Sequence, residues 1–386
     1  MSERDVLLDV SRLIWRLWRG RLPTGVDRVC LAYLDHYRSR SRAVVQRKGR
    51  YFVLTERHSD RLFDSLASGP KGFRRSMVQL GLRAFPAARR APEKEGLIYL
   101  NVGHTGLDDP SLGGWIAEAR VRAIFLIHDL IPLLHSKFCR PGEQAKHERR
   151  MENVLGSAAG LIANSEATAA DIRAFARARG LAVPPIVVAL LGTPKDPANV
   201  EPRRFDRPHF VTVGTIEGRK NHVLLLNLWR RLATEGHSAV PILVIVGQRG
   251  WEAECAIEML DHAHDLEGHV VELDQCADDE LAAIITGARA LLMPSFAEGF
   301  GLPVMEALEL GTPVIASDLA VFREFAGDLP TYLDPADELA WERAIDALAG
   351  DSPEREQQLQ RIRGYRAPDW NTHFDTVDPW IGTLVQ

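Results

Sequence analysis

Two glutamates in a glycine-rich stretch are the residues whose types and spacing most directly indicate chemistry. Residues 298–310 place Glu298 in a loop with two glycines and Glu306 in the pattern of a following helix. Gly299 and Gly301 allow the backbone to approach a ligand, and the free N–H groups and dipole of a helix start favour an anion such as a diphosphate. Glu306 lies about one turn into the helix, where it could reach the ribose of a diphosphate bound at the helix start. Glu298, in the loop, would face the group attached to the other end of that diphosphate. The pattern predicts a sugar-nucleotide site; the alternative is two solvated acids at an ordinary helix entry.

The elements around these glutamates are a strand, a loop and a short helix. Residues 290–294 form an apolar run typical of a buried parallel strand, and Pro303 and Gly311 bracket the helix. The whole stretch, with seven residues between Glu298 and Glu306, resembles the signature of family 4 retaining glycosyltransferases of the GT-B fold. The resemblance implies that Glu298 contacts the donor sugar and Glu306 the ribose. It also implies that the diphosphate lies at the backbone of Gly299, Phe300, Gly301 and Leu302.

A second segment, residues 209–222, resembles the strand, loop and helix that carry the diphosphate clamp in the same family. The resemblance implies that Arg219 and Lys220 hold the donor diphosphate and that Gly214 and Thr215 belong to the same donor-binding loop. Two fixed cations stabilise a leaving group that gains charge as the glycosidic bond breaks. Without the resemblance, these residues predict no more than a solvated basic turn.

The acceptor-binding residues are expected in the N-terminal part of the chain. Thr24 is predicted to cap a helix that begins near Gly25, and Asp27 lies three residues after Thr24. The loop at this helix start, residues 23–28, occupies the place of a glycine-rich loop in related transferases. It has a single glycine, which weakens a role for Gly25 in phosphate contact. His128 and Asp129 follow an apolar strand, where ligands of open α/β sheets bind. They resemble the family's histidine motif, which implies that His128 lies near the reacting sugar or the acceptor hydroxyl; the alternative is a structural histidine at a strand end.

The expected mechanism uses no metal ion and no cofactor beyond the nucleotide diphosphate sugar, with GDP or UDP as the nucleotide. The sequence contains no Asp-x-Asp pair, the usual metal-diphosphate ligand set of the other large glycosyltransferase fold. Arg219, Lys220 and the helix start supply positive charge instead. Transfer is expected with retention at the anomeric carbon, the departing diphosphate oxygen assisting deprotonation of the acceptor. Glu298 then holds donor hydroxyls rather than acting as a nucleophile, and the predicted catalytic residues are Glu298, His128, Arg219 and Lys220.

Positive charge is concentrated in the first quarter of the chain. Residues 1–100 hold 21 of the 47 Lys and Arg residues and 10 of the 52 Asp and Glu residues, a net charge of +11 against −16 for the remainder. Residues 12–21 and 71–85 interleave arginines with apolar side chains, a pattern typical of segments that dock on anionic lipid or on an anionic acceptor. The alternative is a solvated face and a loop. No nucleic-acid-binding signature is recognisable, so nucleic acid is not an expected partner.

Short apolar strands alternate with helical patterns along the chain, which predicts an α/β protein with parallel sheets. We expect two doubly wound, Rossmann-like domains that face a cleft, joined by the proline-rich residues 193–202. Residues 1–195 are expected to bind the acceptor and residues 203–365 the sugar nucleotide, and the GT-B resemblance implies that residues 366–386 form a helix crossing back to the first domain. The expected strands are 6–10, 97–101, 122–127, 160–163 and 186–190, then 210–213, 242–246, 270–273, 290–293 and 313–316.

Length and composition favour a large two-domain enzyme in the cytoplasm. The chain has 386 residues, 46% of them hydrophobic, enough for two cores. It has no apolar run near the roughly 20 residues of a membrane span and no signal-peptide pattern. We expect a retaining hexosyltransferase, with mannose the first sugar to test, that acts on a glycan or lipid-linked acceptor in cell-surface polysaccharide synthesis, such as lipopolysaccharide, and associates peripherally with the inner membrane face. The alternatives are a sugar-nucleotide epimerase of the same fold and a non-catalytic transferase-like subunit.

Overall fold

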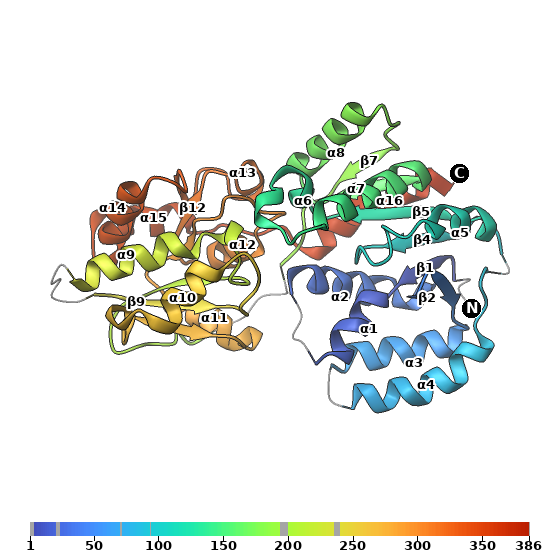
Figure 1. Cartoon of the computed structure of the whole chain (residues 1–386), viewed down its shortest axis with the longest axis horizontal. Coiled ribbons are helices and arrows are strands. Elements are labelled where there is room, and N and C mark those ends of the chain that lie inside the picture. The colour runs from blue at the N-terminus through green and yellow to red at the C-terminus, as the bar shows by residue number, and fades with distance from the viewer. Residues whose placement is uncertain are drawn as a thin grey trace. The chain divides into compact units, whose positions relative to one another are not determined.

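The computed structural model describes residues 4–20, 24–69, 72–92, 94–193, 200–234 and 240–385. The chain divides into two compact units, called here the first and the second unit (Figure 1). The first unit comprises Met1–Leu130, Gln144–Leu191 and Trp370–Gln386, and the second comprises Ile131–Glu143 and Gly192–Asp369. Several positions used in the sequence predictions lie outside the described residues: 194–199 of the linker, Pro23 of the N-terminal loop, and Arg21 and Lys71 of the basic segments.

The first unit is built on a seven-stranded sheet with the order β3-β2-β1-β4-β5-β6-β7. All neighbouring strands are parallel except β3, which pairs antiparallel with β2 at one edge. The strands are β1 (Val6–Asp9), β2 (Ser41–Arg47), β3 (Arg50–Val53), β4 (Ile98–Asn101), β5 (Arg122–Ile127), β6 (Gly160–Ala163) and β7 (Ile186–Val188). Every residue of β1, β4 and β6 is buried, as expected for strands covered on both faces.

Helices cover both faces of this sheet. They are α1 (Ser11–Trp18), α2 (Gly25–Tyr37), α3 (Glu56–Ala67), α4 (Phe73–Ala87), α5 (Ser111–Ala119), α7 (Glu143–Ser157), α8 (Glu166–Arg179) and α16 (Trp370–Val385). Local sequence sets their ends. The N-cap of α8 is Ser165, whose side chain accepts a hydrogen bond from the Thr168 N–H, and its C-cap is Gly180, in the left-handed conformation.

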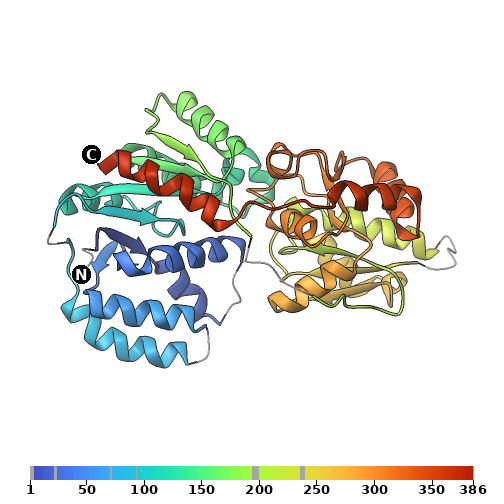
Figure 2. The same ribbon diagram turned by 180° about the vertical axis from the view of Figure 1, so that it is seen from behind.

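The C-terminal helix α16 packs on the first unit (Figure 2). Its His373 lies between the Tyr33 hydroxyl, 2.8 Å from Nε2, and the Leu190 carbonyl, 2.9 Å from Nδ1. The Trp380 ring lies against Gly160, where a Cβ atom would come within 2.6 Å of it. These contacts join residues far apart in the sequence into one core.

The second unit has a six-stranded, fully parallel sheet with the order β10-β9-β8-β11-β12-β13. Its strands are β8 (His209–Val213), β9 (Ile242–Val246), β10 (Val270–Leu273), β11 (Leu291–Met293), β12 (Val314–Ser317) and β13 (Thr331–Leu333). Its helices are α6 (Ile131–Leu134), α9 (His222–Thr234), α10 (Glu254–His262), α11 (Asp278–Gly287), α12 (Leu302–Glu309), α13 (Ala320–Ala326), α14 (Glu338–Ala349) and α15 (Pro353–Ile362).

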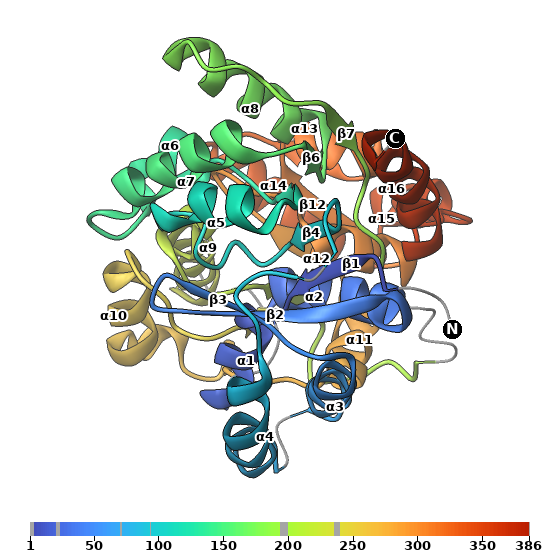
Figure 3. The ribbon, with the colours of Figure 1, turned by 90° about the vertical axis from the view of Figure 1, so that its right-hand side faces the viewer.

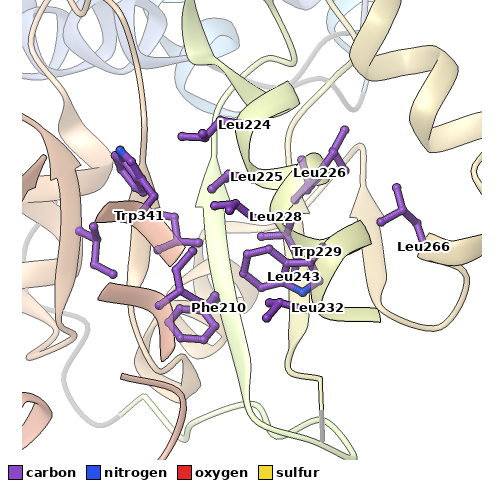
Figure 4. Close-up of a cluster of buried hydrophobic side chains, with 14 of the residues drawn as sticks. Phe210, Leu224, Leu225, Leu226, Leu228, Trp229, Leu232, Leu243, Leu266 and Trp341 are labelled. Atoms are coloured by element: carbon purple, nitrogen blue, oxygen red, sulfur yellow. The ribbon is translucent and has the colours of Figure 1, made fainter. Parts of the chain in front are cut away.

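Two tryptophans anchor the core of the second unit (Figure 4). Trp229 on α9 and Trp341 on α14 are fully buried among leucines of the same cluster. Each indole N–H still has a carbonyl partner, Pro241 at 2.8 Å and Asp334 at 2.9 Å. Because a buried indole needs an acceptor for its N–H, these bonds allow the rings to pack deep in the core without an unsatisfied donor.

Three strands were not predicted from the sequence. β2 begins with Ser41 and Arg42, β3 is only four residues long, and β13 is only three. Such short or partly polar runs carry little period-two signal. Helices cover most of the described part of both basic segments, since α1 overlaps residues 12–21 and α4 overlaps residues 71–85. The alternative that these segments form a loop therefore does not hold for the residues in those helices.

Both sheets reverse their strand order beside their first strand. In the first unit the reversal lies between β1 and β4, and in the second unit between β8 and β11. At such a point the connections on either side of the reversal diverge, which leaves a crevice outside the carboxyl ends of the strands where ligands of open α/β sheets bind. The loops after β8 and after β11 carry the two segments that resemble donor-site motifs, so the topology brings them together.

No helix in the part of the chain that the structure describes is long and apolar enough to cross a bilayer.

Candidate functional site

The centre of the candidate site is the Glu298 carboxylate, in the loop between β11 and α12. Its side chain is 5% exposed and lies 2.6 Å from the Lys220 ammonium and 2.8 Å from Nη1 of Arg219. The Ser295 hydroxyl donates to the same carboxylate at 2.7 Å. Arg219 also pairs with Glu217, at 2.6 Å. Three of the four predicted catalytic residues, Glu298, Arg219 and Lys220, are therefore in direct contact.

The charges of this cluster depend on one another. Burial by itself raises the pKa of Glu298, but the positive charges of Lys220 and Arg219 and the hydrogen bonds from Lys220 and Ser295 outweigh it and lower the pKa to about 2. Burial also lowers the pKa of Lys220, an effect that Glu298 opposes, and burial raises the pKa of Glu217. Glu298 is thus ionised throughout the physiological range and holds two cations at the switch point of the sheet.

Gly214 allows the Lys220 side chain to lie across the end of β8. Gly214 has a φ of +138°, and a Cβ atom on it would come within 3.0 Å of the Lys220 side chain. Thr215 follows, and a Cβ atom on Gly250 would lie only 2.6 Å from the Thr215 methyl group. The loop after β8 is consequently packed too closely for larger residues at Gly214 and Gly250.

The predicted diphosphate loop ends in a tight helix start. Gly301 precedes α12 with a φ of +103°, and a Cβ atom there would lie 2.3 Å from the Phe322 ring. Phe300 is buried against Phe325, with 5.1 Å between ring centroids, while Gly299 and Leu302 are partly exposed. Glu306 lies one turn into α12 and is half-buried. The backbone N–H groups at this helix start are the ones on which an anion would bind.

A cavity of about 520 Å³ lies at the carboxyl ends of β9 and β10, lined by Gln248, Arg249, Glu272 and Asp274. Arg249 makes a forked set of hydrogen bonds, to Glu272 at 2.8 Å and to Asp261 at 2.7 and 3.0 Å. These bonds raise the pKa of Arg249 and fix the plane of its guanidinium. Arg249 could not be predicted from the sequence, because a lone arginine after a strand has no distinctive spacing.

The fourth predicted catalytic residue, His128, lies in the first unit. It is 5% exposed, and its Nε2 lies 2.8 Å from the Val102 carbonyl, so Nε2 carries the proton and Nδ1 is left as an acceptor. Burial lowers its pKa to about 4, although the hydrogen bond with Val102 opposes the effect. The ring centroid of His104 lies 4.8 Å away. His128 is therefore a neutral imidazole, and the adjoining Asp129 is half-buried.

Asp27, predicted to belong to the N-terminal loop, lies instead in the first turn of α2, because the helix already begins at Gly25. It is 1% exposed and pairs with Arg12 at 2.7 Å and Arg16 at 2.9 Å. The Thr24 N–H and hydroxyl both donate to it, and α2 begins at Gly25 as predicted. Gly25 itself is exposed. The charges of both Asp27 and Arg12 influence the pKa of His128, which indicates that these residues share one neighbourhood near the switch point of the first sheet.

Within the residues that the structure describes, no group of three or more His, Cys, Asp or Glu side chains is arranged to hold a metal ion.

Comparisons with known proteins give the same picture for the second unit. Residues 197–364 match the family model described as glycosyl transferases group 1. The chain is 30% identical over 234 residues to the serotype-specific mannosyltransferase WbdA of Escherichia coli, covering 56% of this chain and 28% of WbdA. It is 36% identical over 125 residues to the O-antigen chain mannosyltransferase B of the same organism, covering 32% of each. The chain thus spans about a third or less of the length of these relatives.

Solved structures extend the similarity to the whole fold. The structure of Anabaena Alr3699/HepE in complex with UDP and glucose superposes with a TM-score of 0.68 at 15% identity, covering 99% of this chain and 100% of that one. Sucrose-phosphate synthase from Thermosynechococcus elongatus gives a TM-score of 0.58 at 17% identity, covering 98% and 97%. The two sheets and their helices constitute a GT-B fold.

Proposed function

Because the chain carries a glycosyl transferases group 1 domain on a GT-B fold, we propose that it is a retaining glycosyltransferase that moves a hexose from a nucleotide diphosphate sugar to a glycan or lipid-linked acceptor. Mannose is the proposed sugar, because WbdA and O-antigen chain mannosyltransferase B are mannosyltransferases by name. GDP and UDP are the proposed nucleotides, and the superposed HepE structure is a complex with UDP and glucose. Cell-surface polysaccharide synthesis is the proposed setting.

The observation that carries this proposal is the contact of Glu298 with Arg219 and Lys220 beside the start of α12. A diphosphate at the helix start would accept hydrogen bonds from the backbone N–H groups and from the two cations. As the glycosidic bond breaks, negative charge moves onto the diphosphate, where fixed cations stabilise it. Neutralising that charge by side chains and a helix terminus supports a mechanism without a metal ion.

Glu298 is proposed to hold the donor sugar. With its pKa at about 2, the carboxylate is ionised and accepts hydrogen bonds from sugar hydroxyls without donating a proton. Its two oxygens already accept from Lys220, Arg219 and Ser295, so they are held in place and weakened as a nucleophile. We assign deprotonation of the acceptor to the departing diphosphate oxygen on the same face of the sugar, which gives retention at the anomeric carbon.

The first unit is proposed to bind the acceptor. His128 presents a neutral imidazole whose Nδ1 can accept a hydrogen bond from an acceptor hydroxyl, because Nε2 is committed to Val102. Asp129, half-buried beside it, and the first turn of α2 with Gly25 and Asp27 complete the proposed acceptor region. We also propose that the protein associates peripherally with an anionic membrane when its acceptor is lipid-linked.

The test is a product analysis with GDP-mannose, UDP-glucose and related donors, with lipid-linked and soluble glycan acceptors. Nuclear magnetic resonance of the new glycosidic bond reports its anomeric configuration; an inverted product would contradict the proposed mechanism. Glu298→Gln is expected to lower turnover at least about a hundredfold, as the loss of a charge-assisted contact in the transition state does. The exposed Glu254 supplies the matched control, Glu254→Gln, which should not change turnover.

Two outcomes would favour the alternative functions. Exchange of the proton at the sugar 2-position with solvent deuterium, in the absence of acceptor, would indicate an epimerase. A chain that binds no donor and turns over no acceptor, yet associates with another transferase, would indicate a non-catalytic subunit. A covalent glycosyl-enzyme on Glu298 of the parent chain, absent from Glu298→Gln, would overturn the assignment of Glu298 as a donor-binding residue.

A further inference from the structure

The basic segments at residues 12–21 and 71–85 play no part in the donor site, and they meet on one surface of the first unit. Their helices, α1 and α4, pack against each other and against α3 (Figure 3). Arg74 Nε donates to the Trp18 carbonyl at 2.8 Å and so joins the start of α4 to the end of α1. The exposed residues of this helix pair and of the end of α1 are called here the α1–α4 face: Trp15, Trp18, Arg19, Arg74, Arg75 and Val78.

The apolar part of the α1–α4 face consists of large side chains left in solvent. Trp15 is 53% exposed, Trp18 is 41% exposed and Val78 is 54% exposed. Trp15 and Trp18 are three residues apart on α1, so they project from the same side of the helix. The Arg19 guanidinium lies 5.2 Å from the Trp15 ring. A cluster of exposed apolar groups rimmed by charge is typical of an interaction surface rather than of a solvated helix.

The charge of the α1–α4 face is positive. Residues 11–20 and 72–90 include several arginines and no aspartate or glutamate. Arg12 and Arg16 both pair with the buried Asp27, whose single negative charge offsets one of their two positive charges, whereas Arg19, Arg74 and Arg75 are exposed.

The carboxylates of the neighbouring helix α3 do not neutralise the positive charge of the α1–α4 face. On α3, Asp60 pairs with Arg4 at 2.8 Å and Asp64 pairs with Arg38 at 2.6 Å. Glu56 lies 4.0 Å from Arg4 as well. The carboxylates of α3 are therefore matched by arginines outside the face, and the three exposed arginines of the α1–α4 face are available to an anionic partner.

We propose that the α1–α4 face docks the first unit on an anionic lipid surface. Tryptophan has an apolar ring and a polar N–H, and it prefers the boundary between headgroups and acyl chains. Trp15 and Trp18 would lie at that boundary, with Val78 beside them and Arg19, Arg74 and Arg75 at the lipid phosphates. The purpose of docking, access to a lipid-linked acceptor, rests on the proposed function, whereas docking itself uses none of the donor-site residues.

The combination of groups favours lipid over two other occupants. A neutral glycan could stack on the two indoles, but it gives the arginines no anionic partner. A second copy of this chain would bring like charges together, since all charged side chains that define the α1–α4 face are positive. An anionic bilayer complements the indoles, the valine and the arginines at the same time.

The experiment is sedimentation of the full chain with vesicles of phosphatidylcholine, alone or with phosphatidylglycerol, at low and high salt. We expect binding to the anionic vesicles that weakens as salt rises. Both the Trp15→Ala/Trp18→Ala and the Arg19→Glu/Arg75→Glu variants should bind at least about tenfold more weakly. The matched controls are Val183→Ala and Leu339→Ala, which remove comparably exposed apolar side chains elsewhere, and Arg173→Glu/Arg177→Glu on α8. These controls should bind like the parent chain.

Donor titration of the same variants separates this proposal from the proposed function. A variant that binds nucleotide like the parent but fails to bind vesicles is folded and supports docking through the α1–α4 face. Equal binding to neutral and anionic vesicles, or equal loss in the controls, would overturn the proposal. So would a lipid-free dimer that the tryptophan variants dissociate in sedimentation velocity, or loss of turnover on a soluble neutral glycan with vesicle binding unchanged.

Discussion

Replacing Glu298 by glutamine is expected to destabilise the second unit, because two cations depend on its charge. In Glu298→Gln the side chain keeps its shape, but Lys220 and Arg219 lose their carboxylate partner in a site that is nearly closed to solvent. An amide cannot balance a buried ammonium, and its own N–H groups face other donors. Breaking a buried ion pair by removing one partner is more costly than the pair's net contribution, because the remaining charge stays buried.

The magnitude follows from the pKa of the carboxyl. The contacts lower the pKa of Glu298 from 4.5 to about 2. A difference of this size corresponds to about 3 kcal/mol of unfolding free energy at pH 7 and about 2 kcal/mol at pH 3.5. Because the folded pKa is the lower one, this stabilisation is complete above pH 4.5 and is lost as the pH falls toward 2. The loss in Glu298→Gln should therefore be larger at pH 7 than at pH 3.5.

The assay is urea unfolding read by pulse-labelling hydrogen exchange and mass spectrometry, since peptides from β8 and β9 then report the second unit alone. Glu254→Gln, at an exposed glutamate of the same unit, serves as the control and should shift the unfolding free energy by less than about 0.5 kcal/mol. Equal stability of Glu298→Gln and the parent at pH 7 would show that the Glu298 ion pairs do not stabilise the second unit. A difference in stability between the two proteins that grew as the pH fell would show the same.

Three further predictions concern other parts of the site. Gly301→Ala places a Cβ atom 2.3 Å from the Phe322 ring at a φ of +103°, so it should weaken nucleotide binding at least about tenfold in a calorimetric titration; unchanged affinity would contradict the assignment of this loop. Asp27→Asn leaves Arg12 without its carboxylate and should lower the unfolding free energy of the first unit by roughly 2 kcal/mol in urea. An unchanged unfolding free energy would show that the ion pair contributes nothing to stability. The pKa of His128, about 4, predicts that its ring resonances in nuclear magnetic resonance do not titrate between pH 8 and 5.5, whereas a midpoint near 6.5 would mean that the ring is solvated.

The local structure of the two predicted donor loops could be predicted because its signals are local. A strand, a glycine turn and a helix follow one another within a few residues, and each glycine has a steric reason, as Gly301 shows with the Phe322 ring. What the sequence could not indicate is that Glu298 contacts Arg219 and Lys220, since these residues are about 80 positions apart. That contact depends on β8 and β11 being neighbours in the sheet, which only the strand order establishes.

Other features lacked a local signal altogether. Asp27 was predicted from its place in a capping pattern, but its pairing with Arg12 and Arg16 depends on how α1 turns back onto α2. The Arg249 fork joins the ends of β9 and β10 to α10, with no spacing that marks it in the sequence. The strand β2 starts with polar residues and was missed, because its burial depends on tertiary packing rather than on alternation.

The central claim is that Arg219, Lys220 and the start of α12 bind the diphosphate of a sugar nucleotide. The most direct test is a calorimetric titration of the full chain with GDP, UDP and their sugar conjugates in metal-free buffer. Arg219→Ala is the test variant, and Arg230→Ala, at an arginine on α9 that pairs with Asp265, is the control. We expect that one nucleoside diphosphate binds, that Arg219→Ala weakens its binding by about ten- to a hundredfold, and that Arg230→Ala leaves its binding unchanged. Absence of binding across the panel, or equal affinity in Arg219→Ala and the parent chain, would show that these residues do not bind a diphosphate.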